Sequence, residues 1–355
     1  MRQFFIAAAL MASAIGCVSP YALRHDRDDP FVRRFDGNLY LRGVRYPLVG
    51  IDARTLASSV PSDKISSCGH WYAPEEIDDL FHKVRESGGT AVRLWAFRSF
   101  TEEGRSFRQL DYVIARAKAY DVRLVLALVH RHGACDGGKL RDTVWYRRGY
   151  RQGGDGFGQT YLDHVRGIVE RYRDEPTVAM WQLTDADPWT GPPVDDNAVF
   201  AFAQDVAYEI KKIDRNHLVA FGPDILHGSK AKPFAAIPWV DVHMGSDTRR
   251  LWIRAWSENA YDCVAAAKKY RKACIMSPIG VDLSRDTRPL KDLYATMRDG
   301  QVASALITGV DGSFIAAQQP GDPMIADPDG VSPAIRALRF LVHFVWDRTG
   351  RHPPY

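Results

Sequence analysis

Short, almost wholly apolar runs alternate with amphipathic stretches along most of the chain. Eight of the apolar runs predict buried strands, because parallel strands covered on both faces read as near-continuous apolar segments. These runs are residues 48–52, 91–97, 123–130, 178–183, 218–222, 240–243, 274–279 and 305–310. Their regular spacing indicates β–α units rather than hairpins.

The stretches between these runs carry helical signals. Pro74-Glu75-Glu76 opens one helix and Gly88-Gly89 ends it. Further helices are predicted at residues 110–120, 161–171 and 199–213, and Ser332-Pro333 starts a last one that runs to about residue 346. Eight units in about 300 residues predict a single (β/α)8 TIM barrel. A doubly wound sheet is the alternative, but no glycine-rich phosphate loop follows the first strand.

The N-terminal region divides into three parts. Arg2 and the short apolar stretch 4–15 predict a signal peptide over residues 1–17. The segment that ends at Cys17 resembles a lipoprotein cleavage site, with plain secretion as the alternative. We expect residues 18–30 to be a tether and 31–355 to be the barrel, opened by a β-hairpin at 31–46. The protein is then exported: periplasmic, an outer-membrane lipoprotein, or secreted.

Composition changes this picture little. The chain is 46% hydrophobic and 25% charged, with a net charge of +4 from scattered basic and acidic residues. This pattern gives no support to nucleic-acid binding. If Cys17 carries lipid, four cysteines remain, and we favour Cys68–Cys135 and Cys263–Cys274 among the three pairings. Because the cysteines and histidines lack the spacing of metal ligands, we expect no metal. We also expect no cofactor, and a monomer.

The residues at the ends of the strands are where a barrel of this kind places its chemistry. Arg93 projects from the second strand, and a buried arginine needs a carboxylate partner, for which Asp52 and Asp185 are the candidates. Four segments serve as anchors for comparison with known families: residues 93–97, residues 110–114, residues 171–178 before Trp181, and residues 217–219 at strand five.

In their order and spacing, these segments resemble glycoside hydrolase family 5, in its endo-β-1,4-mannanase branch. The resemblance runs from the hairpin to the last helix and implies a retaining hydrolase that acts on a β-linked glycan. Such enzymes use two glutamates about 5 Å apart, one as acid/base and one as nucleophile. The acid/base is expected after strand four in a Trp-Glu-Leu-x-Asn-Glu-Pro-like run, and the nucleophile at the end of strand seven in a Glu-Phe-Gly-like run.

This sequence departs from the family at both positions. Counted from Trp181, the asparagine position is Asp185 and the glutamate position is Ala186, whereas counting back from the following proline gives Asp187. Asp187 is therefore the best remaining acid candidate, with Asp185 behind it. The family nucleophile falls on Pro278, beside Ser277, and the nearest carboxyl group is that of Asp282.

Other residues are expected to contact the sugar. The resemblance places Arg93 beneath the nucleophile and His130 and His243 along the cleft. Aromatic faces suit the apolar faces of sugar rings, so Trp95, Trp145 and Trp189 are further candidates, with core packing as the alternative for each.

Three hypotheses follow. We favour a barrel that binds glycan with lost or strongly reduced hydrolysis, because a retaining mechanism needs its nucleophile. The alternative is an active glycosidase with relocated carboxylates, drawn from Asp185, Asp187, Asp282 and Asp311. The third is an envelope-anchored structural protein without a sugar ligand.

Overall fold

We describe a computed structural model of the chain. It describes residues 27–59, 72–133, 135–185, 193–222, 234–247, 263–280 and 304–308, together with Leu338 and Val342. All structural statements below concern these residues.

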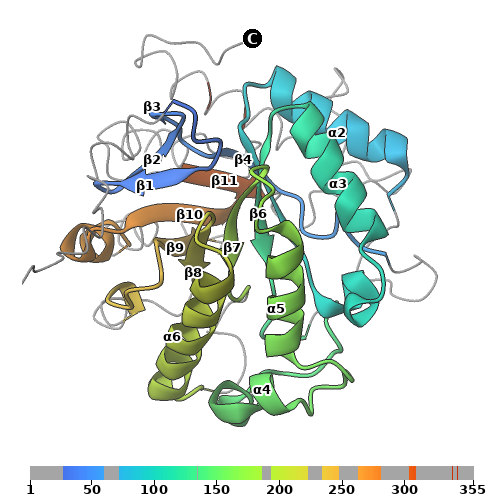
Figure 1. Ribbon diagram of the computed structural model, residues 1–355, viewed down its shortest axis with the longest axis vertical. Helices are drawn as coiled ribbons and strands as arrows, with labels where there is room; N and C mark the ends of the chain where they lie inside the picture. The colour runs from blue at the N-terminus through green and yellow to red at the C-terminus, as the bar shows by residue number, and fades with distance from the viewer. Residues whose placement is uncertain are drawn as a thin grey trace, which may run out of the picture.

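The core of the fold is a closed barrel of eight parallel strands in the order β10-β11-β4-β5-β6-β7-β8-β9 (Figure 1). The predicted (β/α)8 TIM barrel is thus confirmed, and the predicted strands lie within a few residues of the observed ones. The observed bounds are β4 Val49–Asp52, β5 Ala91–Trp95, β6 Arg123–Ala127, β7 Val178–Gln182, β8 Leu218–Phe221, β9 Val242–Asp247, β10 Ala273–Gly280 and β11 Ser304–Thr308.

The closest packing between two of these strands requires a glycine. A Cβ atom built on Gly50 in β4 would lie 1.6 Å from the carbonyl oxygen of Ala91 in β5. No side chain fits at that separation, so Gly50 lets the two backbones approach. The pairing of Asp52 with Arg93 in the same ladder depends on this approach.

The helices begin at the signals that the sequence carries. In α2, Pro74–Glu86, the backbone nitrogen of Ala73 donates to the Glu76 carboxylate at 2.8 Å. In α5, Tyr161–Tyr172, the Thr160 hydroxyl accepts from the backbone nitrogen of Asp163. The remaining helical elements are η1 Arg98–Gly104, α3 Arg108–Ala119, η2 Trp145–Gly149, α4 Tyr150–Gln152 and α6 Asp196–Ile213. Of the predicted last helix, only Leu338 and Val342 are described, and both are helical.

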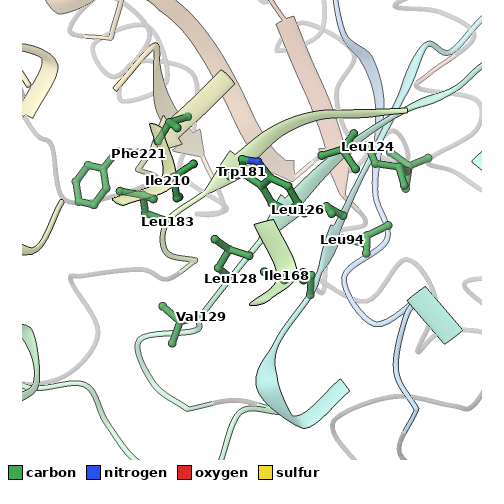
Figure 2. Close-up of a cluster of buried hydrophobic side chains, with 14 of the residues drawn as sticks. Leu94, Leu124, Leu126, Leu128, Val129, Ile168, Trp181, Leu183, Ile210 and Phe221 are labelled. Atoms are coloured by element: carbon green, nitrogen blue, oxygen red, sulfur yellow. The ribbon is translucent and has the colours of Figure 1, made fainter. Parts of the chain in front are cut away.

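Two buried apolar layers hold the barrel. The outer layer lies between strands and helices, where Trp181 packs with Leu126 and Ile168 (Figure 2). The inner layer fills the barrel and draws residues from at least six strands, among them Ala91, Val125, Met180, Leu218, Val242, Met244, Ala273 and Ile275. Along β5, β9 and β10, where side chains alternate between faces, membership in these layers shows which way a strand residue points.

The predicted N-terminal hairpin is present and closes one end of the inner layer. Strands β1, Arg33–Phe35, and β2, Asn38–Leu41, pair in antiparallel fashion, and a third strand, β3 Val44–Arg45, extends them. Asp36 and Gly37 form the turn with φ of 45° and 75°, the left-handed values that tight hairpin turns require. Leu39 and Leu41 then pack against the inner layer.

No helix within the described residues is long and apolar enough to cross a membrane.

Candidate functional site

A buried charge network lies at the C-terminal ends of β4, β5 and β7. Arg93 of β5 is fully buried, and its guanidinium reaches three partners. Its Nη1 donates to Asp52 Oδ1 at 2.7 Å, its Nε donates to Gln182 Oε1 at 2.7 Å, and its Nη2 lies 2.7 Å from Asp185 Oδ1. Both carboxylates proposed as partners of Arg93 are therefore confirmed. We call these four residues the charged wall.

The charged wall fixes the protonation state of Asp185. Burial by itself would raise the pKa of the Asp185 carboxyl, but the positive charges of Arg93 and Arg54 outweigh burial and hold that pKa well below its usual range. The same pairing works in reverse, since Asp185 and Asp52 overcome burial and raise the pKa of Arg93. Asp185 is thus a stable carboxylate and cannot store a proton for delivery near neutral pH.

An aromatic shelf, Trp95 with Phe97, lies beside the charged wall. The Trp95 indole nitrogen donates to Asp185 Oδ2, and its ring stacks on Phe97 with centroids 4.8 Å apart. The Arg54 guanidinium lies 5.8 Å from the Trp95 ring centroid and donates to Asp52 Oδ2 at 2.9 Å. Since Trp95 is only 5% exposed, it supports the mouth and offers little of its face to a ligand.

His130 is the predicted ligand-binding residue that reaches the surface of the mouth. It follows β6, forms a parallel bridge with Asp185, and packs against Trp95 with ring centroids 5.4 Å apart. Its Nδ1 accepts from the backbone nitrogen of His132 at 3.2 Å, which leaves Nε2 as the protonated nitrogen of a neutral ring. Burial lowers the pKa of His130 to about 4, although the charge of Asp185 opposes this.

Ser277 of β10 occupies the other side of the mouth. Ala273 and Ile275 belong to the inner layer, so alternation along β10 turns Ser277 toward the barrel interior as well. Ser277 is fully buried, and no described residue gives its Oγ a hydrogen-bond partner. The register of β10 shifts between Met276 and Ile279, the segment that contains Pro278. The inward position nearest to the expected nucleophile is therefore a serine.

Comparisons with known proteins agree with this geometry. The family described as GH family 5 beta-mannosidase-like matches residues 150–283. The mannan endo-1,4-beta-mannosidase 5 of Solanum lycopersicum is 24% identical over 249 residues, which cover 62% of this chain and 57% of that protein. The chain thus spans somewhat more than half the length of this curated relative.

Solved structures give the same answer for the fold. The endo-1,4-beta-mannanase from Rhizomucor miehei has a TM-score of 0.61 and 17% identity over 90% of this chain and 99% of that one. The endo-beta-1,4-mannanase from Thermotoga petrophila has the same TM-score and identity over 87% and 78%. The chain thus resembles a GH family 5 beta-mannosidase-like domain over residues 150–283 and shares the barrel fold of these mannanases.

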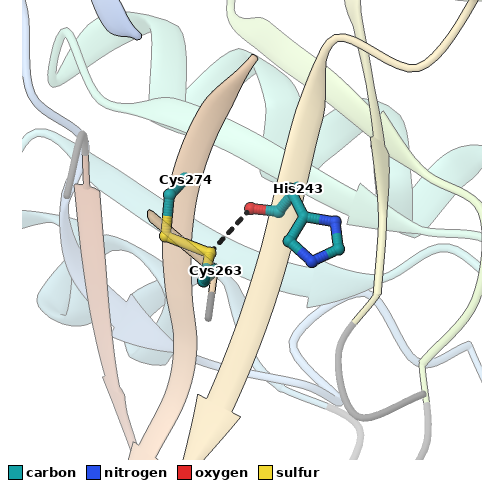
Figure 3. The surroundings of a disulfide bond; sticks show 3 residues. All are labelled: His243, Cys263 and Cys274. Carbon is teal, nitrogen blue, oxygen red and sulfur yellow. Dashed lines mark hydrogen bonds between the residues drawn. A yellow bond between two sulfur atoms is a disulfide. The ribbon is translucent and has the colours of Figure 1, made fainter. Parts of the chain in front are cut away.

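His243 does not line the mouth of this mannanase-like barrel, contrary to the expectation from the resemblance. Its neighbours Val242 and Met244 belong to the inner layer, so alternation turns His243 outward. There the ring is buried, burial lowers its pKa to about 4, and its carbonyl oxygen lies 3.6 Å from Cys263 Sγ (Figure 3).

The predicted disulfide between Cys263 and Cys274 is present, with Cα atoms 5.7 Å apart. It joins β10 to the helical segment before it, on the outer face of the strand that carries Ser277 (Figure 3). We call β10, with Ser277 on its inner face and the Cys263–Cys274 disulfide on its outer face, the β10 wall. Cys135 is also disulfide-bonded, but Cys68, its predicted partner, lies outside the described residues.

Trp145 has the contacts of a structural residue in the mannanase-like barrel rather than those of a sugar platform. It is 5% exposed, and its indole nitrogen donates to Asp155 Oδ2 at 2.9 Å. Its ring packs against four aromatic side chains, Tyr146, Tyr150, Tyr161 and Phe202. The predicted binding role of Trp145 therefore has no support in its surroundings.

A second buried charge network, which sequence reasoning missed, holds the loops below Trp145. Arg98 contacts Asp155 through two nitrogens, and Arg141 donates to Asp136 Oδ2 at 2.9 Å. Burial would raise the pKa of Asp155, but Arg98 outweighs it and lowers that pKa. Arg98 and Asp155 are 57 positions apart in the sequence, so no local motif indicates that they form a pair. Gln182 was also missed, although its place next to Trp181 on an inward position was a usable signal.

Several predicted site residues lie outside the described residues. They are Cys17, Ala186, Asp187, Trp189 and Asp282, and no structure is assigned to them. Their proposed roles stay predictions. Within the described part of the chain, no group of three or more His, Cys, Asp or Glu residues could hold a metal ion.

Proposed function

We propose that this mannanase-like barrel binds a β-linked glycan of the mannan type at its C-terminal mouth and has lost retaining hydrolysis. One observation carries the proposal: both described carboxylates of the mouth, Asp52 and Asp185, pair with Arg93, while the inward residue of β10 is Ser277. A retaining enzyme needs its two carboxyl groups on opposite sides of the scissile bond.

The charges support the loss of hydrolysis. Asp185 is held ionised by Arg93, so it does not serve as the acid that protonates a leaving sugar. Ser277 has no carboxylate to form a glycosyl intermediate, and no described base contacts its hydroxyl. Arg93, which the family places beneath the nucleophile, is already neutralised by partners on its own side of the barrel.

The same surface supports glycan binding. The neutral His130 ring carries a protonated Nε2 next to Trp95, and the Arg54 guanidinium lies over the Trp95 ring. Hydrogen-bond donors of this kind match the hydroxyl groups of a sugar. Relatives of the chain are named mannan endo-1,4-beta-mannosidases, which makes β-mannan the first ligand to test.

Affinity electrophoresis through gels that contain glucomannan or galactomannan tests the binding. We expect the native chain to be retarded and His130→Ala to be retarded less, while the matched control His82→Ala, an exposed histidine of α2, behaves as native. Native mobility in every β-linked polymer would contradict glycan binding. Equal loss of retardation in His130→Ala and His82→Ala would show that the effect of His130→Ala is not specific to the mouth.

A reducing-end assay on the same polymers distinguishes a barrel that only binds glycan from an active glycosidase. We expect no release by the native chain. If the native chain releases reducing ends and Asp187→Ala does not, the protein is an active glycosidase with a relocated acid, and the proposed loss of hydrolysis is wrong. The assignment of the mouth as the glycan site would be unaffected.

We also propose that the protein is exported, with Cys17 as the lipid-bearing residue. Disulfides persist in oxidising compartments, and the Cys263–Cys274 bond is consistent with such a location. Mass spectrometry of the N-terminal peptide from a membrane fraction is expected to find an acylated Cys17. An unprocessed N-terminus in the cytosolic fraction would overturn the proposal.

A further inference from the structure

An exposed pair of aromatic side chains lies on the surface away from the mouth. Tyr208 is 44% exposed and Trp239 is 40% exposed, and they are two of four large apolar side chains exposed in the described part of the chain. Their ring centroids are 5.4 Å apart and the ring planes meet at 53°. Two large rings that contact each other while both remain open to solvent form a small angled surface.

The pair lies toward the end of the barrel opposite the mouth. Trp239 precedes β9, so it belongs to a loop at the N-terminal end of the strands. Tyr208 lies in the second half of α6, whose C-terminal end leads into β8 at that same side. Any ligand of this pair is therefore separate from a ligand at His130.

A buried lysine fixes the backbone on both sides of Trp239. Lys272 Nζ donates to the carbonyl oxygens of Ile237 at 3.1 Å and Pro238 at 3.2 Å, and also to that of Val240. Lys272 is 6% exposed, so these bonds are shielded from water. The exposed Trp239 therefore lies in a loop whose backbone is held by hydrogen bonds to one ammonium group. Because this loop is already ordered, less conformational entropy is lost when a ligand binds.

Polar groups border the rings. The Lys212 ammonium lies 5.7 Å from the Tyr208 ring centroid and donates to Glu209 Oε1 at 3.1 Å. The surface therefore combines two aromatic rings with an ammonium and a carboxylate on α6, and such a combination suits a sugar, which has apolar C–H faces and a rim of hydroxyl groups.

The size of the pair argues against a second copy of the chain as the occupant. A stable protein interface buries at least about 1,000 Å², whereas one aromatic side chain contributes at most about 250 Å². Two rings that are less than half exposed fall well short of that area. One or two sugar rings, by contrast, are covered by two aromatic faces.

We propose that Tyr208 and Trp239 form a second binding site for β-linked polysaccharide, at the opposite end of the barrel from the mouth. This rests on the proposed function only for the choice of ligand class. Two sites on opposite ends make the protein bivalent toward a polymer, so retention on long chains exceeds what the mouth alone provides.

Four chains separate the two sites in one experiment: native, Tyr208→Ala/Trp239→Ala, His130→Ala, and all three changes together. Val44→Ala serves as the control for loss of an exposed apolar side chain. Retention on glucomannan and on galactomannan is measured by affinity electrophoresis, with circular dichroism to verify folding. We expect the double aromatic variant to bind about tenfold more weakly, because two stacking faces are lost, and the triple variant to bind more weakly still.

Each outcome decides between the sites. Equal retention of the double aromatic variant and the native chain overturns the second site and leaves the mouth standing. Full retention of His130→Ala beside a loss in the aromatic variant supports the second site and contradicts the mouth. If sedimentation shows that the native chain self-associates and the aromatic variant does not, the occupant is a second copy and the glycan assignment is wrong. No retention of the native chain on either polymer overturns both sites.

Discussion

The charged wall and the β10 wall border the same mouth but are held by different interactions. In the strand order, β10 lies three strands away from both β5 and β7, so the two walls are on different sides of the barrel. On the charged wall, two carboxylates and an amide surround Arg93. On the β10 wall, a disulfide fixes the outer face, while the inward Ser277 has no partner among the described residues.

On the proposed function, this difference describes a barrel whose arginine stays paired without a carboxylate on β10. The resemblance places an asparagine at position 185 and a glutamate at the end of strand seven. Here Asp185 stands at the first position and Ser277 with Pro278 at the second. Asp185 thus adds a second negative charge beside Arg93, whereas the inward position of β10 is uncharged. With an asparagine at position 185, Arg93 would still pair with Asp52, but one buried positive charge of the site would lose a partner.

The largest expected effect is from Asp185→Asn, which removes the charge but keeps the shape. Arg93 then keeps only one carboxylate in a water-free site, and we expect the free energy of unfolding to fall by about 3–5 kcal/mol. Urea unfolding measures it. The matched control is Asp79→Asn, which breaks the exposed pair with Lys83 and changes stability by about 0.5 kcal/mol or less. Equal effects of the two substitutions would show that the Asp185–Arg93 pair contributes no more to the free energy of unfolding than a surface ion pair.

The next effect concerns the β10 wall. Replacing Cys263 and Cys274 together by serine opens a loop with a sequence separation of 11 residues. We expect unfolding free energy to fall by about 2–3 kcal/mol, as loop-closure entropy predicts for so short a loop. Reducing agent should give the same result in the native chain and none in the variant, apart from the contribution of Cys135. A stability unchanged by both treatments would contradict the holding role of this disulfide.

Acid is expected to weaken both walls through a buried histidine behind each. His164 contacts the carbonyl oxygen of Ala96 near the charged wall, and His243 lies behind the β10 wall; burial lowers the pKa of each to about 4. Because the unfolded rings titrate near pH 6.5, the unfolded chain binds protons first. Stability is therefore fully present above about pH 6.5 and falls toward pH 4, by roughly 1–3 kcal/mol for each ring.

Unfolding measured between pH 4.5 and 7.5 tests this pH dependence. His164→Leu and His243→Leu should each make the slope shallower, and His82→Leu, with its exposed ring, should not. A native stability that stays level over this range would contradict the neutral state of the two rings.

The smallest expected effect is from Ser277→Ala. Its hydroxyl is buried without a described partner, so its removal changes stability by no more than about 0.5 kcal/mol and can be stabilising. Glycan retention should remain native. A loss above about 2 kcal/mol would show that Ser277 has a strong hydrogen bond, and the contrast between the walls would disappear.

The strands and the partners of Arg93 could be predicted for physical reasons that act locally. A strand buried on both faces must be apolar along its length, and a buried charge must be neutralised by a neighbour. The orientation of His243 could not be predicted, because the alternating apolar residues before it do not show which layer they join: Val240 packs in the outer layer, whereas Val242 packs in the inner layer. Nor could the Arg98–Asp155 contact, since two side chains 57 positions apart meet only after the loops have packed.

The N-terminal hairpin has a consequence for how any ligand reaches this barrel. Leu39 and Leu41 fill the end of the inner layer that lies below the first residues of the strands, with Val32 beside them. Among the described residues, the barrel interior is therefore packed with side chains and covered by the hairpin at this end. A polymer can lie across the rim or rest against the outside wall, but it cannot be threaded from one end to the other, so chain length by itself sets no limit on what the rim can accept.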